Sequence, residues 1–290
     1  MNGIGYKIKK TILYILLILL SVVCMFPFLL MIVNATRSGS EIMKSFTLIP
    51  SVYLKENWAT VFKYFNLFLG MWNSLKVAVP STLLCAYFSA MTAYALAMYK
   101  FKGNKVLFMT ILIFMMIPGQ LGLIGFYNLC TKLHLVNSYI PLIIPAIASP
   151  GTVFFLRQYV LSVMPPSLIE AARIDGASPL TVLLKVYLPI SLPALATVGL
   201  FAIVNHWNDY FSGLIYMSKA SMYPLQTYIQ QLTVDLTQIT DADQLKQLSA
   251  LNNRSFNAAK IVVSTIPLLI IYPFLQKYFV TGMVIGAVKE

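Results

Sequence analysis

The chain has 290 residues, of which 59% are hydrophobic and only 10% are charged, and its mean hydropathy is +0.77. This composition excludes an ordinary soluble domain, in which about a quarter of the residues are charged. The net charge of +12 does not indicate nucleic-acid binding, because the basic residues are scattered through short loops. The sequence therefore predicts a membrane protein with lysines and arginines flanking its spans and with no nucleic acid as a partner.

Long apolar runs follow one another along the chain. About 20 mostly apolar residues are needed to carry a helix across roughly 30 Å of hydrocarbon. Five runs reach this length without Asp, Glu, Lys or Arg, and a shorter sixth run lies between Lys260 and Lys277. We predict an all-α polytopic protein, with one transmembrane domain over residues 1–290 and six spans, at 11–35, 74–99, 106–129, 137–158, 187–217 and 256–279.

The distribution of basic residues predicts the orientation. Short loops rich in Lys and Arg stay in the cytoplasm. Segment 7–10 holds three lysines before the first span, and segment 100–105 holds three more between the second and third, with no acid in either segment. With six spans, both termini and segment 157–185 lie in the cytoplasm, and segments 37–68 and 219–255 lie outside.

The later outer segment, Tyr223 to Asn253, is polar and contains Asp235, Asp241 and Asp243. It offers a docking surface for another protein, although a merely solvated loop would have the same composition.

Prolines interrupt several of the predicted spans. Such breaks persist in a membrane only where neighbouring helices or a water-lined cavity satisfy the freed carbonyl groups. Both a helix bundle around a pathway and simple helix packing explain them. The positions are Pro27, Pro118, Pro150, Pro267 and Pro273.

The segment between the fourth and fifth spans is predicted to form two short helices joined by a sharp turn. Ser167 and Glu170 form the S-x-x-E pattern of a capping box at the start of the first helix. Gly176 supplies the left-handed residue that ends this helix. Ser178 then caps the second helix, with Pro179 at its first position, and that helix runs toward Pro189.

A helix-turn-helix of this kind suggests DNA reading in other contexts. Here membrane spans hold it on both sides within a few residues, so it cannot settle into a major groove. A rigid cytoplasmic projection can instead seat in a groove of another protein and move the attached spans. The small side chains of Ala171 and Ala172 allow a partner to approach closely.

The letters of this loop resemble a known family. Glu170-Ala171-Ala172-x-x-Asp175-Gly176-Ala177, followed by Leu188-Pro189-Ile190-x-x-Pro193, is similar to the EAA loop of ATP-binding-cassette (ABC) importer permeases. Further matches, which together cover nearly the whole chain, resemble the maltose-type permeases of carbohydrate uptake. They are Asn73-Ser74-Leu75, Ala93-Tyr94-Ala95-Leu96-Ala97, Met116-Ile117-Pro118 and Trp207-Asn208-Asp209. The stretches 272–279 and 286–289 are more similar to the branch of this family that is linked with oligosaccharides and aldouronate-like substrates.

The resemblance implies the type I importer permease fold, with segment 165–187 as a cytoplasmic coupling loop that docks on an ATPase. It implies a multi-pass subunit of a bacterial inner membrane that moves a sugar by alternating access. Its partners would be a second, homologous permease, two ATPase subunits, an external sugar-binding protein and membrane lipid. The residues implied in ATPase coupling are Ser167, Glu170, Ala171, Ala172, Asp175, Gly176, Ala177 and Pro189.

The sequence lacks the phosphate-binding loop of an ATPase. A P-loop needs G-x-x-x-x-G-K-[ST], and no Gly is followed directly by Lys anywhere in the sequence. We therefore expect a subunit without catalytic residues or cofactor, with ATP and Mg²⁺ bound by the partner ATPase. Neither the cysteines (Cys24, Cys85 and Cys130) nor the histidines (His134 and His206) show metal-ligand spacing, so no metal site and no enzyme site are expected.

Polar residues inside spans are the candidates for a substrate pathway, because burying them in lipid is costly. Asp209 interrupts the fifth span, but it follows Pro189 by twenty residues, about 30 Å of helix, and so belongs near the outer mouth. Trp207 is either an interfacial anchor or a sugar contact. The pathway candidates are Asn73, Gln120, Asn205, Trp207, Asn208 and Asp209.

The alternative function is a secondary transporter or channel that is not driven by ATP. Ion coupling needs charges inside the spans, and the predicted spans offer little besides Asp209 and the interfacial Lys76. The sequence therefore favours the ABC permease.

Overall fold

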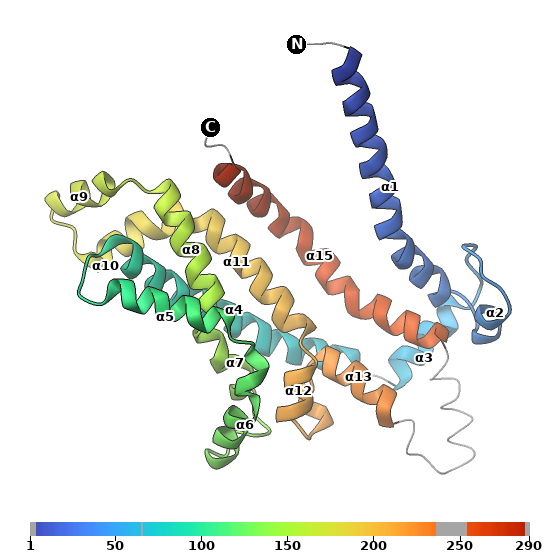
Figure 1. The fold of residues 1–290 in the computed structure, drawn as a ribbon. Helices are drawn as coiled ribbons and strands as arrows, with labels where there is room; N and C mark the ends of the chain where they lie inside the picture. Colours follow the sequence, from blue (N-terminus) through green and yellow to red (C-terminus); the bar gives the residue numbers. More distant parts are fainter. Residues whose placement is uncertain (1–3, 65, 236–253, 288–290) are drawn as a thin grey trace. The chain divides into compact units, whose positions relative to one another are not determined.

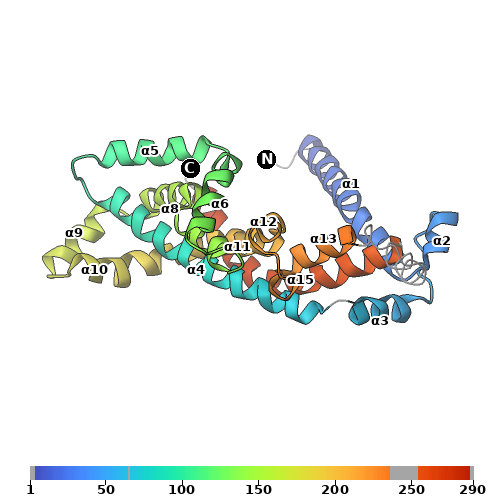
Figure 2. The ribbon, with the colours of Figure 1, turned by 90° about the horizontal axis from the view of Figure 1, so that it is seen from below.

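The computed structural model describes residues 4–64, 66–235 and 254–287, and every regular element in these ranges is a helix (Figures 1 and 2). The all-α prediction is confirmed. The chain divides into two compact units. The first comprises residues 1–67 and 232–266, and the second comprises residues 68–231 and 267–290.

The first unit begins with α1 (Ile4–Ala35), which is helical throughout although it contains Pro27. The C-terminal end of α1 is tied to α3 (Leu54–Tyr64). The Asn57 side chain, on α3, donates hydrogen bonds to the carbonyls of Ala35 and Arg37, both at 2.9 Å. These bonds satisfy carbonyl groups that the end of a helix leaves unpaired. The helix of the first predicted span is thus followed by a well-defined segment of short helices.

Between α1 and α3 lies the short helix α2 (Gly39–Lys44), which starts with a reciprocal capping box. The Ser38 hydroxyl accepts from the Glu41 amide, and a Glu41 carboxylate oxygen accepts from the Ser38 amide. The buried Arg37 guanidinium donates to the carbonyls of Glu41 (2.7 Å) and Ser45 (3.0 Å). This box was not predicted, although Ser38 and Glu41 form the same S-x-x-E pattern that the later loop contains.

The second unit opens with α4 (Leu67–Met98), which covers the second predicted span. The third predicted span, 106–129, is not one straight helix. α5 (Asn104–Met116) stops before Pro118, and a 3-10 turn η1 (Gly119–Gly122) and α6 (Leu123–Lys132) then continue at 92° to it. Pro118 causes the bend, because the residue before a proline avoids helical dihedrals, and Ile117 is extended at φ −81°, ψ 123°.

The fourth span is also interrupted. It runs from Ile140 to Val163 through α7 (Ile140–Ile143), the 3-10 turn η2 (Ile144–Ile147) and α8 (Pro150–Val163). Ser149 is not helical (φ −113°, ψ 86°), and Pro150 starts α8. The predicted break at Pro150 is confirmed. The helix continues to Val163, past residue 158, and the limits of the span stay a prediction.

The fifth span was predicted at 187–217, and the helix in this region has other bounds, while the limits of the span itself stay a prediction. One continuous helix runs from Pro179 to Asn208, made of α10 (Pro179–Val182), a π-turn η3 (Leu183–Tyr187) and α11 (Leu188–Asn208). Pro189 does not break it, because the π-turn shifts the bonding and Leu188 donates to Leu183 five residues back. Asp209 is extended and ends the helix.

Short elements follow the fifth span, namely α12 (Phe211–Tyr216), η4 (Ala220–Met222) and α13 (Leu225–Asp235). The proposed docking segment Tyr223 to Asn253 lies largely outside the described residues. The last helix, α15 (Arg254–Ala287), runs through the sixth predicted span. In the described part of the chain, four helices are long and apolar enough to cross a membrane, and the bent α5–α6 pair would be a fifth. The count of six spans stays a prediction.

Candidate functional site

The helix that carries the EAA letters is α9 (Pro166–Ile174), and it begins earlier than predicted. Pro165 is its N-cap, and no side chain caps it. The capping box at Ser167 and Glu170 is therefore wrong. Pro166 occupies the first helical position, where its fixed φ and missing N–H suit a helix start. Ser167 consequently lies inside the first turn.

The end of α9 is as predicted. Gly176 has φ +79°, the left-handed conformation that glycine adopts without strain. The Ala177 amide donates to Ala172 (2.9 Å) and the Gly176 amide to Arg173 (3.0 Å), which is the bonding of a Schellman motif. Two carbonyls at the end of the helix are thus satisfied, and the chain reverses sharply.

The start of the next helix is also as predicted. The Ser178 hydroxyl accepts from the Thr181 amide at 3.2 Å, and Pro179 takes the first helical position. Gly176 and Ser178 together fix the angle between α9 and the long helix that begins at Pro179.

The outer surface of α9 is accessible. Glu170, Ala171 and Asp175 are exposed, and Ile174 is 86% exposed. Leu180 and Leu184, on the helix that follows, are also exposed, at 60% and 51%. A group of exposed apolar side chains around exposed charges is typical of a protein-binding surface. Of the predicted coupling residues, Ser167, Gly176 and Pro189 are likewise exposed, and Ala172 and Ala177 are half-buried.

The inner side of α9 is part of a buried apolar cluster, here called the hinge cluster. Ile169 is 4% exposed and is the α9 residue buried in it. Its other members come from three segments, namely α4, α8 with its C-cap residue, and the helix Pro179–Asn208. They are Ala90, Ala93, Tyr94, Leu156, Val160, Met164, Val182, Leu183, Tyr187, Ala194 and Val198.

Three tyrosines reinforce the hinge cluster. The rings of Tyr94 and Tyr187 are 4.9 Å apart, and the Tyr94 hydroxyl lies within hydrogen-bond distance of the Tyr99 hydroxyl (2.9 Å) and donates to the Pro179 carbonyl (3.2 Å). From α9, the Arg173 guanidinium lies over the Tyr99 ring at 4.9 Å. These contacts join α9 and the helix that starts at Pro179 to the end of α4.

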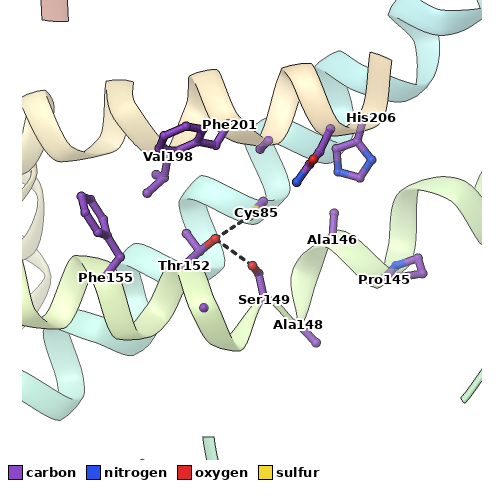
Figure 3. Close-up of a pocket in the computed structure, with 13 residues that line it drawn as sticks. Cys85, Pro145, Ala146, Ala148, Ser149, Thr152, Phe155, Val198, Phe201 and His206 are labelled. Atoms are coloured by element: carbon purple, nitrogen blue, oxygen red, sulfur yellow. Dashed lines mark hydrogen bonds between the residues drawn. The ribbon is translucent and has the colours of Figure 1, made fainter. Parts of the chain in front are cut away.

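A cavity of about 430 Å³ lies between α4, α11 and the interrupted fourth span (Figure 3). Its polar part is built where α8 begins. The Thr152 hydroxyl accepts from the Ser149 hydroxyl (2.7 Å) and from the Cys85 thiol (3.6 Å). Asn205 and His206 line it from α11, together with the aromatic rings of Phe155 and Phe201. Hydroxyl, amide and aromatic groups therefore converge on this cavity.

Among the predicted pathway residues, only Asn205 lines this cavity. Asn73 is buried, and its amide donates to the carbonyls of Ser221 (2.9 Å) and Tyr223 (3.2 Å). Asp209 accepts from the Ser212 amide at 3.0 Å, at the start of α12. These two polar groups satisfy backbone atoms of the segments that follow α11.

The remaining pathway candidates are dispersed. Trp207 is 2% exposed and lines a separate apolar cavity with Leu200 and Tyr272. Gln120 and Asn208 are exposed, on η1 and at the end of α11. The structure does not bring the six residues together, and the role of each in transport stays a prediction.

The cavity residues Ser149, Thr152, Phe155 and Phe201 were not predicted from the sequence. A signal was present in the run Ser149-Pro150-Gly151, which places a hydroxyl at a helix break inside a span. Irregular backbone at membrane depth is tolerated where it is buried in protein or lines a cavity.

Comparison with known proteins places this geometry in a family. Residues 82–285 match the family described as "Binding-protein-dependent transport system inner membrane component". The arabinooligosaccharides transport system permease protein AraQ of Halalkalibacterium halodurans is 33% identical over 271 residues, which is 92% of each chain. The polygalacturonan/rhamnogalacturonan transport system permease protein YtcP of Bacillus subtilis is 30% identical, over 98% of this chain and 99% of the relative.

A solved structure has the same fold. A chain of a bacterial ABC transporter involved in the import of the acidic polysaccharide alginate superposes with a TM-score of 0.80 at 26% identity, covering 96% of this chain and 99% of that one. The family match spans well over half of this chain, and the fold agrees over nearly all of it. The chain therefore belongs to the binding-protein-dependent transport system inner membrane components, and it is a permease subunit of an ABC importer.

Proposed function

We propose that this permease imports an oligosaccharide, and that α9 transmits the motion of a separate ATPase to the cavity at Ser149. One observation carries the proposal. Val198 belongs to the hinge cluster under α9 and also lines the cavity. The surface offered to a partner and the walls of the cavity are therefore joined by one packed group of side chains.

The chemistry of the cavity supports a sugar as substrate. Sugars offer hydroxyl groups and apolar ring faces, and sites for such ligands combine aromatic walls with a few placed polar groups. Phe155 and Phe201 supply the first, and Ser149, Thr152 and Asn205 supply the second. The names of the relatives point the same way, since AraQ serves arabinooligosaccharides and YtcP serves polygalacturonan and rhamnogalacturonan.

Membership of the family supports the following assembly. The working transporter contains this chain, a second homologous permease, two ATPase subunits that bind ATP and Mg²⁺, and an external sugar-binding protein. ATP hydrolysis takes place in the partner subunits. This arrangement puts α9 and both termini in the cytoplasm, and it agrees with the lysines of segments 7–10 and 100–105.

The mechanism is alternating access. Closure of the ATPase pair moves α9, the hinge cluster passes this motion to α4, α8 and α11, and the cavity changes the side on which it opens. ATP binding thereby exposes the cavity to the sugar-binding protein, and hydrolysis returns it to the cytoplasm.

Coupling is tested by Glu170→Gln and Gly176→Ala in the assembled transporter in proteoliposomes. We expect ATP-driven uptake to fall at least about fivefold, a typical allosteric coupling, while the subunits stay in the membrane. Glu56→Gln is the matched control, since Glu56 is an exposed acid on α3. Wild-type uptake by both test variants would contradict the role of α9.

Orientation is tested by cysteine labelling. The native Cys24, Cys85 and Cys130 are first replaced by serine or alanine, and single cysteines are placed at Glu170 and at Glu56. A membrane-impermeant reagent added to intact cells should label position 56 and spare position 170. Labelling of position 170 from outside would end the proposal, because no cytoplasmic ATPase could reach α9.

A further inference from the structure

A second cavity of about 430 Å³ lies where α4, the loop after it, α5 and α8 come together. It is here called the basic cavity, and the transport scheme assigns it no ligand. Its lining combines cations with apolar and amide groups. The lining residues are Leu96, Ala97, Tyr99, Lys100, Phe101, Gly103, Asn104, Lys105, Val106 and Arg157.

The basic cavity is at the same end of the bundle as α9. Tyr99, one of its lining residues, carries the Arg173 guanidinium of α9 over its ring at 4.9 Å. Figure 1 shows the α4–α5 loop at the end of the bundle where α9 and α10 lie. If α9 faces the ATPase, as in the proposed function, the basic cavity opens at the cytoplasmic surface of the membrane.

Several features give this cavity a positive potential. Lys100, Lys105 and Arg157 line it, and no Asp or Glu is among its lining residues, all of which are described. It also holds the N-terminus of α5, where aligned peptide dipoles amount to roughly half a positive charge. The N-cap is Gly103, which has no side chain to accept hydrogen bonds from the first-turn amides.

An aromatic ring holds Arg157 in place. Its guanidinium lies 3.9 Å from the centre of the Phe108 ring, which fixes it against α5. Its Nε is buried and has no hydrogen-bond partner among the described residues. A buried donor on a charged group costs free energy when it is unpaired, and a phosphate can supply the missing acceptor.

The surroundings of the cavity are apolar. No residue of α5 is buried, and Val106, which lines the cavity, is 68% exposed. Leu107, Met109 and Ile113 continue this exposed apolar surface along α5, at 52%, 51% and 60%. A cationic cavity that opens onto an exposed apolar helix matches a ligand with an anionic head and hydrocarbon tails.

We propose that the basic cavity binds the phosphate group of an anionic phospholipid from the cytoplasmic leaflet, with the acyl chains along α5. The side of the membrane in this statement rests on the proposed function. Basic pockets between membrane helices on the cytoplasmic side are a known type of lipid headgroup site. The exposed face of α5 favours a lipid over a soluble phosphate or an acidic segment of a partner protein.

The test measures lipid association with the complete purified transporter in phosphatidylcholine nanodiscs that contain a trace of spin-labelled phosphatidylglycerol. We expect the wild type to prefer phosphatidylglycerol over labelled phosphatidylcholine. Lys100→Gln and Lys105→Gln should each weaken this preference about fivefold, the effect of one cation near a membrane surface. Both side chains are exposed, so neither change disturbs the fold. Lys102→Gln is the matched control, because Lys102 is in the same loop but does not line the cavity.

Arg157 separates charge from geometry. Arg157→Gln should weaken the preference as much as the lysine variants do, and Arg157→Lys should restore part of it, since it keeps the charge and loses the planar stack on Phe108. Equal lipid preference in the wild type and in all these variants would overturn the proposal.

Two further experiments identify the source of the anion that binds in the basic cavity. Displacement of the labelled lipid by inorganic phosphate alone would point to a soluble ligand and overturn the lipid assignment. A preference that arises only after removal of the ATPase subunits would assign the cavity to a protein partner, with the same consequence. Lipid association is measured separately from uptake. If the Lys100, Lys105 and Arg157 variants keep the wild-type lipid preference, the lipid site is contradicted. If the Glu170→Gln and Gly176→Ala variants keep wild-type uptake, the transport scheme is contradicted.

Discussion

The hairpin around α9 and the cavity at Ser149 are both built on interrupted helices, yet they use the interruption differently. At α9, Gly176 and Ser178 satisfy the freed backbone groups locally, within a few residues, and the helix surface is left for a partner. At Ser149, the break opens toward side chains from α4 and α11 that are distant in sequence. A local break gives a rigid protrusion, whereas a break among distant helices gives room inside the bundle.

The largest effect is expected from loosening the attachment of α9. Ile169→Ala removes a side chain that is 4% exposed in the hinge cluster, and large-to-small changes of this kind cost about 2–5 kcal/mol. We expect a lower thermal unfolding midpoint of the purified transporter and weak uptake. Ile174→Ala is the control, since Ile174 is 86% exposed and its loss should leave the midpoint unchanged while weakening ATPase binding. Equal midpoints for the two variants would show that α9 is not anchored through Ile169.

A second test concerns close packing after the fifth span. A Cβ on Gly213 of α12 would collide with the Thr227 side chain of α13, so Gly213→Ala should destabilise the protein by about 1–3 kcal/mol. Gly151→Ala is the comparison, because no atom lies within 4 Å of its added Cβ, and it should unfold like the wild type. Both midpoints are measured by thermal unfolding in detergent.

The reversal after α9 is tested at Gly176. Its φ of +79° costs a residue with a Cβ about 1–2 kcal/mol, so Gly176→Ala should lower stability by that amount. Asn tolerates this conformation better, and Gly176→Asn should recover part of both the stability and the uptake. A recovery of uptake by Asn would tie coupling to backbone conformation, and its absence would argue against that link.

The two candidate caps give a smaller and sharper comparison. Ser178→Ala removes a hydroxyl that accepts from the Thr181 amide and should cost about 1 kcal/mol. Ser167→Ala should have almost no effect on stability, because α9 is capped by Pro165 without a side-chain bond. Stability is measured as the thermal unfolding midpoint. Equal decreases in the two variants would show that Ser167 does cap α9, against the structure.

The cavity is tested by its polar groups. Asn205→Ala should raise the half-saturating sugar concentration about three- to tenfold, the effect of losing one or two neutral hydrogen bonds. Asn208→Ala, on the same helix but not lining the cavity, should bind sugar normally. The reverse ranking in uptake titrations would place the sugar at the outer end of α11.

The contrast between the two regions also explains which parts of the fold could be predicted. Gly176, Ser178 and Pro179 act on their own neighbours, so their roles were visible in the sequence. The capping box predicted at Ser167 is wrong because Pro166 also favours a helix start. The two possible N-cap positions are two residues apart, and the sequence pattern does not show which of them the chain uses. The bend at Pro118 and the continuous helix through Pro189 show that prolines in a membrane act through their surroundings.

The polar residues of the spans were the hardest to interpret. An asparagine or aspartate inside a bundle can bind a substrate or satisfy backbone groups, and only tertiary contacts distinguish the two. Asn73 reaches a carbonyl 150 residues away at Tyr223, and no local pattern contains that information. The cavity at Ser149 was missed for the same reason, because its walls come from separate helices.

The helix that starts at Pro179 is longer than a membrane crossing requires. Thirty residues at 1.5 Å each make a rod of about 45 Å, whereas the hydrocarbon layer is about 30 Å thick. The helix is therefore about ten residues longer than one perpendicular crossing of the hydrocarbon layer. Because a continuous helix moves as a rod, a sideways displacement of a few ångströms at one end would tilt it and displace the opposite end without any unfolding.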